Sequence, residues 1–135
     1  MKPDRNTVIH HTATPRGRDV SAAEIREWHK QRGFRDIGYH MVIRLDGSIE
    51  HGRAWHDDGA HARGHNDDLG VALVGTGPDF TPEQLQTLEA VCIFLVRYYP
   101  DGEIRGHKDL AATECPGFDV RHWLRERGLL NGSMD

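Results

Sequence analysis

A chain of 135 residues, of which 37% are hydrophobic and 28% charged, can bury one core but is too short for two domains of ordinary size. Its formal net charge of -4, from 17 basic and 21 acidic residues, argues against direct nucleic-acid binding, because phosphate contacts need a concentrated basic face. No apolar run approaches the roughly 20 residues of a membrane span, and the first residues lack the apolar core of a signal peptide. We therefore expect one soluble domain, residues 1–135, that does not enter a membrane and is made in a cytoplasm.

Strand and helix patterns alternate along the chain. Short β-branched or apolar runs bounded by turn residues indicate strands, and hydrophobic residues at helical spacing indicate helices. Two of the expected helices begin with capping boxes, formed by Ser21 with Glu24 and by Thr81 with Gln84. The expected elements are strands at 7–11, 38–44, 48–51, 70–75 and 103–106, and helices at 22–32, 82–99 and 120–127. This order predicts an α/β fold: one domain with a central mixed β-sheet flanked by two to three helices.

Two turns and one irregular stretch complete the pattern. Asp46-Gly47 is a strong hairpin signal, so the strands on either side of it should be antiparallel. Residues 52–68 are rich in Gly, His, Asp and Ala and show no periodicity. A stretch of that length without secondary structure indicates a binding surface.

Residues of the kinds that bind zinc lie at the end of the first expected strand and in the loop that follows the last one. His107 and Cys115 are joined by a loop whose spacing alone favours an ordinary loop without metal. The Pro-Gly turn after Cys115 and a strand that ends in His10 and His11 favour a metal site. Neighbouring strand residues point to opposite faces, so one of these two histidines can reach the metal, and the residues alone do not choose between them. Three such ligands with an open fourth position are typical of catalytic zinc.

Five segments in the same order resemble one known family. They are VIHHTAT, DIGYHMVIRLDGSIEHGR, GAHARGHNDDLGVALVG, FTPEQLQTL and GHKDLAATECPGFD, and they span about residues 8–123. Together they closely resemble the type 2, zinc-dependent N-acetylmuramoyl-L-alanine amidases, a class that includes the peptidoglycan recognition proteins. EIREWHK followed by GYH is particularly similar to the T7 lysozyme-like phage endolysins.

The resemblance implies roles for individual residues. His10, His107 and Cys115 match the zinc ligands of the family, and Tyr39 matches the tyrosine that assists its chemistry. The T7-like enzymes carry a catalytic lysine two residues before the cysteine, where this chain has Thr113, as catalytic peptidoglycan recognition proteins do. A polar group is thereby kept at this position and a positive charge is lost.

The irregular stretch matches the part of the family that binds substrate. It contains His61, Arg63 and Asn66, which are the candidate substrate-binding residues. For His61 and Asn66 the alternative is hydrogen bonding within the loop itself.

The implied function is that of a zinc hydrolase. It would cleave the amide between the lactyl group of N-acetylmuramic acid and L-alanine of the stem peptide, with Zn²⁺ as cofactor, and so degrade the bacterial cell wall. A non-catalytic binding module is the first alternative, but silent members of the family typically lack the cysteine, which is present here as Cys115.

The resemblance also implies a cellular setting. We expect a monomeric phage endolysin, made in the host cytoplasm, released by a separate pore and acting on the wall in the periplasm. A bacterial recycling amidase that acts on soluble anhydro-muropeptides is the alternative. Binding to a phage RNA polymerase, as in the T7-like proteins, is a further expected interaction that no feature of this sequence locates.

Overall fold

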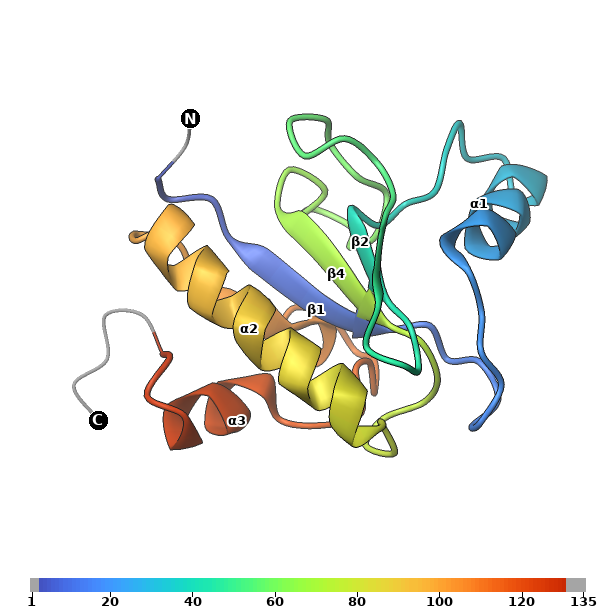
Figure 1. Ribbon diagram of the computed structural model, residues 1–135. Helices are drawn as coiled ribbons and strands as arrows, with labels where there is room; N and C mark the ends of the chain where they lie inside the picture. Colours follow the sequence, from blue (N-terminus) through green and yellow to red (C-terminus); the bar gives the residue numbers. More distant parts are fainter. Residues whose placement is uncertain (1–2, 131–135) are drawn as a thin grey trace.

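The computed structural model describes residues 3–130, and residues 1–2 and 131–135 of the expected domain lie outside the described residues. The described residues form one sheet with helices on both of its faces (Figure 1). In chain order the elements are β1 (Thr7–His11), α1 (Ala22–Gln31), β2 (Met41–Ile43), β3 (Ile49–His51), β4 (Leu69–Leu73), α2 (Pro82–Tyr98), β5 (Ile104–Gly106), the 3-10 turn η1 (His107–Asp109) and α3 (Val120–Glu126).

The five strands lie in the order β3-β2-β4-β1-β5. β2, β4, β1 and β5 are parallel to one another, and β3 pairs antiparallel with β2 through the hairpin. Gly47 takes a positive φ of 86° at the tip of this hairpin, a conformation that glycine adopts without strain. The predicted α/β fold with a central mixed sheet and two to three helices is confirmed.

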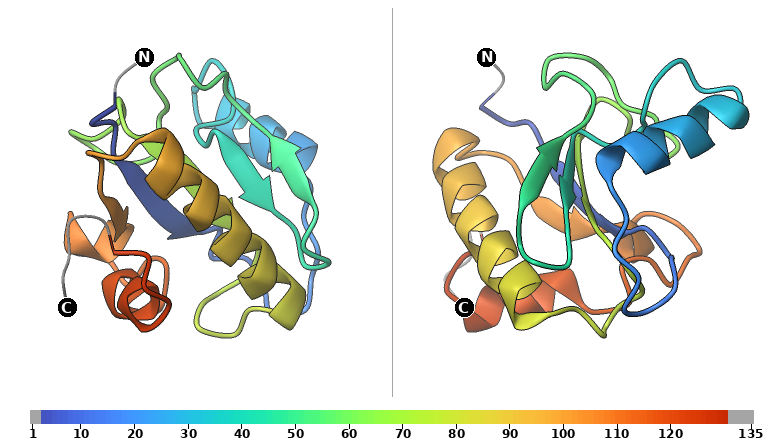
Figure 2. Two further views of the ribbon diagram at one scale, coloured as in Figure 1. Left: turned by 60° about the vertical axis from the view of Figure 1, so that its left-hand side comes forward. Right: turned by 45° about the vertical axis from the view of Figure 1, so that its right-hand side comes forward.

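The helices divide between the two faces of the sheet. Figure 2 shows α2 and α3 together on one face and α1 on the other. Because strand side chains alternate, Ile9 of β1 packs in the core under α2, whereas His10 points to the opposite face. The smaller apolar cluster, which includes Ile25 of α1 and Val42 of β2, lies on that opposite face. Among residues 3–130 no helix is long and apolar enough to cross a membrane.

The long helix α2 is built as its sequence predicts, with one exception. Its first turn contains the capping box of Thr81 and Gln84. Leu85 lies at helical spacing from the buried Leu88 and Cys92, which predicts that it is buried too, but it is only half-buried and Gln84 is fully buried instead. The Gln84 side-chain amide donates hydrogen bonds to the carbonyls of Ile43 at 3.2 Å and Val74 at 2.9 Å. It thereby satisfies the Val74 carbonyl and adds a second donor to the Ile43 carbonyl, which also accepts from the amide of Val74, where strands β2 and β4 end.

The strand predicted at 38–44 is shorter than expected, and the reason bears on the site. Only its last part pairs as β2, because the backbone before it bonds to the irregular stretch 52–68. The carbonyl of Gly38 accepts from the amide of Ala60 at 3.0 Å, and that of Tyr39 accepts from Arg53 at 2.9 Å. These bonds attach the irregular stretch to the backbone that leads into β2.

Candidate active site

Three potential metal ligands meet on the face of the sheet to which His10 points. His10 comes from β1, His107 starts the η1 turn directly after β5, and Cys115 follows in the next loop. β1 and β5 are adjacent parallel strands, so residues almost a hundred positions apart in sequence become neighbours. One ligand atom from each of His10, His107 and Cys115 can be chosen so that all three lie within 4.8 Å of one another.

Backbone contacts hold Cys115 in place. Its Sγ atom accepts a hydrogen bond from the amide of His11 at 3.3 Å. Its carbonyl accepts from the amide of Lys108 at 2.6 Å, which closes the ligand loop. Its own amide donates to the hydroxyl of Thr113 at 3.3 Å. The position of the sulfur is therefore fixed by the protein before any metal binds.

The structure separates the two neighbouring histidines of β1. His11 lies on the other face, where its Nδ1 atom accepts a hydrogen bond from the amide of Gly77 at 3.0 Å. His10 is almost completely buried beside Cys115, with its Nδ1 atom 3.6 Å from the sulfur. Of the two histidines, His10 is the one that the fold brings to His107 and Cys115.

The electrostatics of the cluster suit a metal cation. Burial lowers the pKa of His10 well below its ordinary value, and the neighbouring His61 and His107 lower it further. Burial also lowers the pKa of His107 and raises that of the Cys115 thiol to about 11. Neutral imidazoles are ready to coordinate, and the thiol must lose its proton on binding. Two imidazole nitrogens and one sulfur form a donor set that fits zinc.

Tyr39 lies next to the cluster. Its ring centroid is 5.3 Å from that of His10, and the ring is half-buried between His10 and His29. Burial raises the pKa of Tyr39 above its ordinary value of about 10, and the nearby Cys115 raises it further. The hydroxyl therefore stays protonated at neutral pH, so it can donate a hydrogen bond but is a poor base.

Comparison with known proteins identifies the family. The family model for N-acetylmuramoyl-L-alanine amidase matches residues 1–118. The chain belongs to this family. The endolysin of Escherichia phage T7 is 38% identical over 130 residues, which cover 90% of this chain and 86% of the relative. The N-acetylmuramoyl-L-alanine amidase of Homo sapiens is 35% identical over 134 residues, 85% of this chain and 23% of the much longer relative.

Solved structures of similar proteins support the same family assignment. The N-acetylmuramoyl-L-alanine amidase LysC from Clostridium intestinale URNW superposes with a TM-score of 0.83 at 34% identity, over 95% of this chain and 87% of that one. Wild-type Drosophila PGRP-LB superposes with a TM-score of 0.81 at 27% identity, over 100% of this chain and 88% of that one. The predicted family and enzyme class are confirmed: the chain is an N-acetylmuramoyl-L-alanine amidase, a hydrolase of peptidoglycan.

The remaining predicted site residues of the amidase lie in different settings. Thr113 is exposed and its hydroxyl accepts from the Cys115 amide, next to the cluster. Arg63 is exposed on the irregular stretch. Asn66 uses its Oδ1 atom within that stretch, where it accepts from the amides of His61 at 2.8 Å and Ala62 at 3.0 Å. The Asn66 oxygen is therefore hydrogen-bonded within the loop, which was the alternative to a substrate contact.

Sequence reasoning missed the support that other histidines give. His40 is fully buried, accepts from the amide of Gly70 at 2.9 Å and bonds to the carbonyl of Asp57 at 2.8 Å. His29 accepts from the amide of Gly38 at 2.8 Å. These bonds fix the backbone on either side of Tyr39. The adjacency of His40 to Tyr39 was the only sequence signal of this role.

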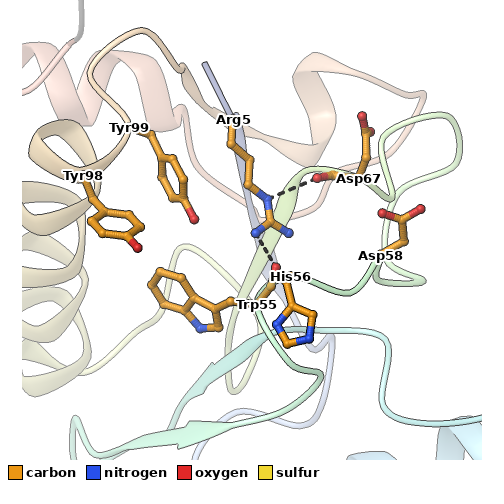
Figure 3. Close-up of a pocket in the computed structure, with 7 residues that line it drawn as sticks. All are labelled: Arg5, Trp55, His56, Asp58, Asp67, Tyr98 and Tyr99. Atoms are coloured by element: carbon orange, nitrogen blue, oxygen red, sulfur yellow. Dashed lines mark hydrogen bonds between the residues drawn. The ribbon is translucent and has the colours of Figure 1, made fainter. Parts of the chain in front are cut away.

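A pocket of about 460 Å³ lies away from the cluster, beside the start of β1 (Figure 3). Arg5 crosses it and donates to the carbonyls of Trp55 and of Asp67, the latter at 3.2 Å. Tyr98 and Tyr99 from the end of α2 form the opposite wall (Figure 3). None of the three metal-site residues lines this pocket. In the amidase, Arg5 ties both ends of the irregular stretch to the sheet.

Proposed function

We propose that this amidase is a zinc-dependent endolysin that cleaves the bond between N-acetylmuramic acid and the L-alanine of the stem peptide. His10, His107 and Cys115 would hold the zinc ion. One observation carries the proposal: two neutral imidazoles and one thiol, from segments far apart in the sequence, converge to within 4.8 Å on one face of the sheet. A donor set of this composition, with three protein ligands, is typical of catalytic zinc.

The chemistry divides between the cofactor and the chain. A zinc ion bound at this site supplies a Lewis acid that activates water and polarises the scissile carbonyl. The chain supplies Tyr39, whose protonated hydroxyl donates a hydrogen bond to the oxygen that gains negative charge as the amide is attacked. Cys115 gives up its proton when it becomes a ligand.

Thr113, Arg63 and Asn66 are proposed to complete the site. The Thr113 hydroxyl accepts from the Cys115 amide, which leaves its proton to be donated to the same developing charge. Arg63 is exposed, so its guanidinium can meet a carboxylate of the stem peptide without losing much hydration. With its oxygen used inside the loop, Asn66 would meet the substrate through its side-chain NH₂ group.

The cellular role follows from the phage relatives. We propose that residues 1–135 act as one monomeric catalytic domain, made in the host cytoplasm and active on the wall in the periplasm. The 38% identity to the endolysin of phage T7 supports this setting over a bacterial recycling enzyme. Binding to a phage RNA polymerase rests on the same similarity, and a transcription assay with the purified protein tests it.

The test uses purified protein on isolated sacculi and on soluble muropeptides, with chelator and then with zinc added back. Mass spectrometry of the products should find stem peptides with a free L-alanine amino group, lost with chelator and restored by zinc. Cys115→Ser should fold but lose this zinc-restored activity, whereas Cys92→Ser, which alters the buried thiol under α2, should keep it. Zinc-independent cleavage would overturn the zinc proposal, and binding without cleavage would favour the non-catalytic alternative. A preference for soluble fragments over sacculi would favour the recycling role.

A further inference from the structure

The imidazole of His61 joins His10 to the backbone of the sheet. Nε2 of His10 lies 2.9 Å from Nδ1 of His61. On its far side, Nε2 of His61 lies 2.9 Å from the carbonyl oxygen of Asp68. The rings of His10 and His61 meet edge to face, with centroids 5.0 Å apart and an interplanar angle of 88°. The result is an unbroken hydrogen-bonded chain from a backbone carbonyl to a residue of the metal cluster.

This chain determines which nitrogen of each ring carries the proton. A carbonyl oxygen only accepts, so Nε2 of His61 must be the donor toward Asp68. A neutral ring has one N–H, which leaves Nδ1 of His61 as an acceptor. Nε2 of His10 must then donate to it, and Nδ1 of His10 is left without a proton. That Nδ1 atom is the one that lies 3.6 Å from the sulfur of Cys115.

Two glycines form the slot that holds the His61 ring. A Cβ atom built on Gly70 of β4 would lie 2.7 Å from Cγ and Cδ2 of His61, and one on Gly59 would lie 2.6 Å from Cδ2. Any side chain at either position would displace the ring. The Asn66 oxygen accepts from the His61 amide and fixes the backbone as well. The ring is therefore positioned by the fold, without help from a ligand.

We propose that His61 is a positioning residue that holds His10 in the tautomer with an unprotonated Nδ1, the form that can bind the metal, and that it does not contact substrate. This inference rests on the zinc-dependent function proposed above and refines the expected role of His61. Both ring nitrogens already have partners inside the protein, so a substrate contact would have to break one of these bonds. Outer residues that orient a metal-binding histidine typically change metal affinity about 10- to 100-fold when removed.

The first test is NMR spectroscopy of the metal-free, ¹⁵N-labelled protein. Long-range proton–nitrogen spectra should place the His10 proton on Nε2 and the His61 proton on its own Nε2. A scalar coupling across the hydrogen bond should connect His10 Nε2 to His61 Nδ1. A proton on His61 Nδ1 would overturn the proposal, whatever the activity of the enzyme.

The second test is zinc affinity, measured by competition with a chromogenic chelator. His61→Leu removes the acceptor and should raise the zinc dissociation constant about 10- to 100-fold. His61→Asn keeps an oxygen near the position of Nδ1 and should stay within a few-fold of the wild type. His56→Leu, which alters an exposed histidine, is the control and should leave the affinity unchanged.

The outcomes separate this inference from the proposed function. Equal zinc affinity for the wild type and His61→Leu would overturn the positioning role. So would an equal loss in His61→Asn and His61→Leu, if circular dichroism shows that both variants are folded. A wild-type chain that binds no zinc would overturn the zinc-dependent function, and the metal-free NMR spectra would still decide the tautomer of His10.

Discussion

The sulfur of Cys115 lies 3.6 Å from Nδ1 of His10, although the two residues are 105 positions apart in the chain. One strand positions both atoms, because β1 carries His10 and also the amide of His11, which donates to the sulfur. A donor pair formed in this way needs little rearrangement to bind a cation. Most of the conformational entropy of these side chains is lost when the protein folds, so that metal binding needs little further ordering.

Tyr39→Phe should lower kcat by about 10²- to 10³-fold, the usual loss for a donor to a developing oxyanion. The reason is that the Tyr39 hydroxyl, whose pKa burial raises, stays protonated beside His10 and can donate a hydrogen bond there. Zinc affinity should be unchanged. Chromatography of cleaved muropeptides gives the rate, and Tyr98→Phe, on the exposed side of α2, is the matched control. An unchanged kcat would remove Tyr39 from the mechanism.

Thr113→Val should lower kcat by at least about 10-fold, because it removes the hydroxyl that bonds to the Cys115 amide and can donate to the substrate. Thr113→Ser keeps the hydroxyl and should retain most of the activity. The same muropeptide assay applies to both variants. If valine and serine behaved alike, the hydroxyl of Thr113 would have no part in the reaction.

Gln84→Leu should destabilise the protein by about 1–3 kcal/mol, since it removes the side-chain donor to the buried carbonyl of Val74, whereas the Ile43 carbonyl still accepts from the amide of Val74. Urea unfolding followed by circular dichroism measures the change. Gln86→Leu, on the exposed side of the same helix, should change stability by less than about 0.5 kcal/mol. Equal effects of the two substitutions would contradict the role given to the Gln84 amide.

Glu103 should make stability depend on pH in the acid range. Hydrogen bonds from Arg105 and then Arg121 lower the pKa of Glu103, although partial burial opposes them. A carboxyl whose folded pKa lies below its unfolded value of about 4.3 stabilises the protein above that pH, and the contribution disappears as the pH falls through the folded pKa. Urea unfolding should therefore show a smaller loss of stability between pH 6 and pH 3 for Glu103→Gln than for the wild type. Glu83→Gln, an exposed residue of α2, should follow the wild type.

Much of the fold could be predicted because its signals are local. The capping box at Thr81, the hairpin at Gly47 and the apolar run of β4 each determine a short segment without reference to the rest of the chain. The role of Gln84 could not be predicted in this way. Its burial depends on two strand ends that reach it only in the folded protein.

In the candidate site, too, some features could be predicted from the sequence and others depend on contacts that form only in the folded protein. The family motifs pointed to His10, His107 and Cys115, whereas strand alternation alone could say only that His10 and His11 face opposite ways. The fold distinguishes the two histidines, because Nδ1 of His11 accepts a hydrogen bond from the amide of Gly77. The contact between His10 and His61 had no sequence signal, since the stretch that carries His61 has no periodicity and is shaped by bonds to distant backbone.

The division of the sheet into two faces has a practical consequence for anyone who wishes to alter this enzyme. The apolar core under α2 and α3 and the histidine-rich cluster lie on opposite sides of the same strands. Substitutions that improve the packing under α2 can raise thermal stability without moving the side chains of the site. Libraries directed at new wall chemistries belong instead in the 52–68 stretch and the loop that carries Cys115.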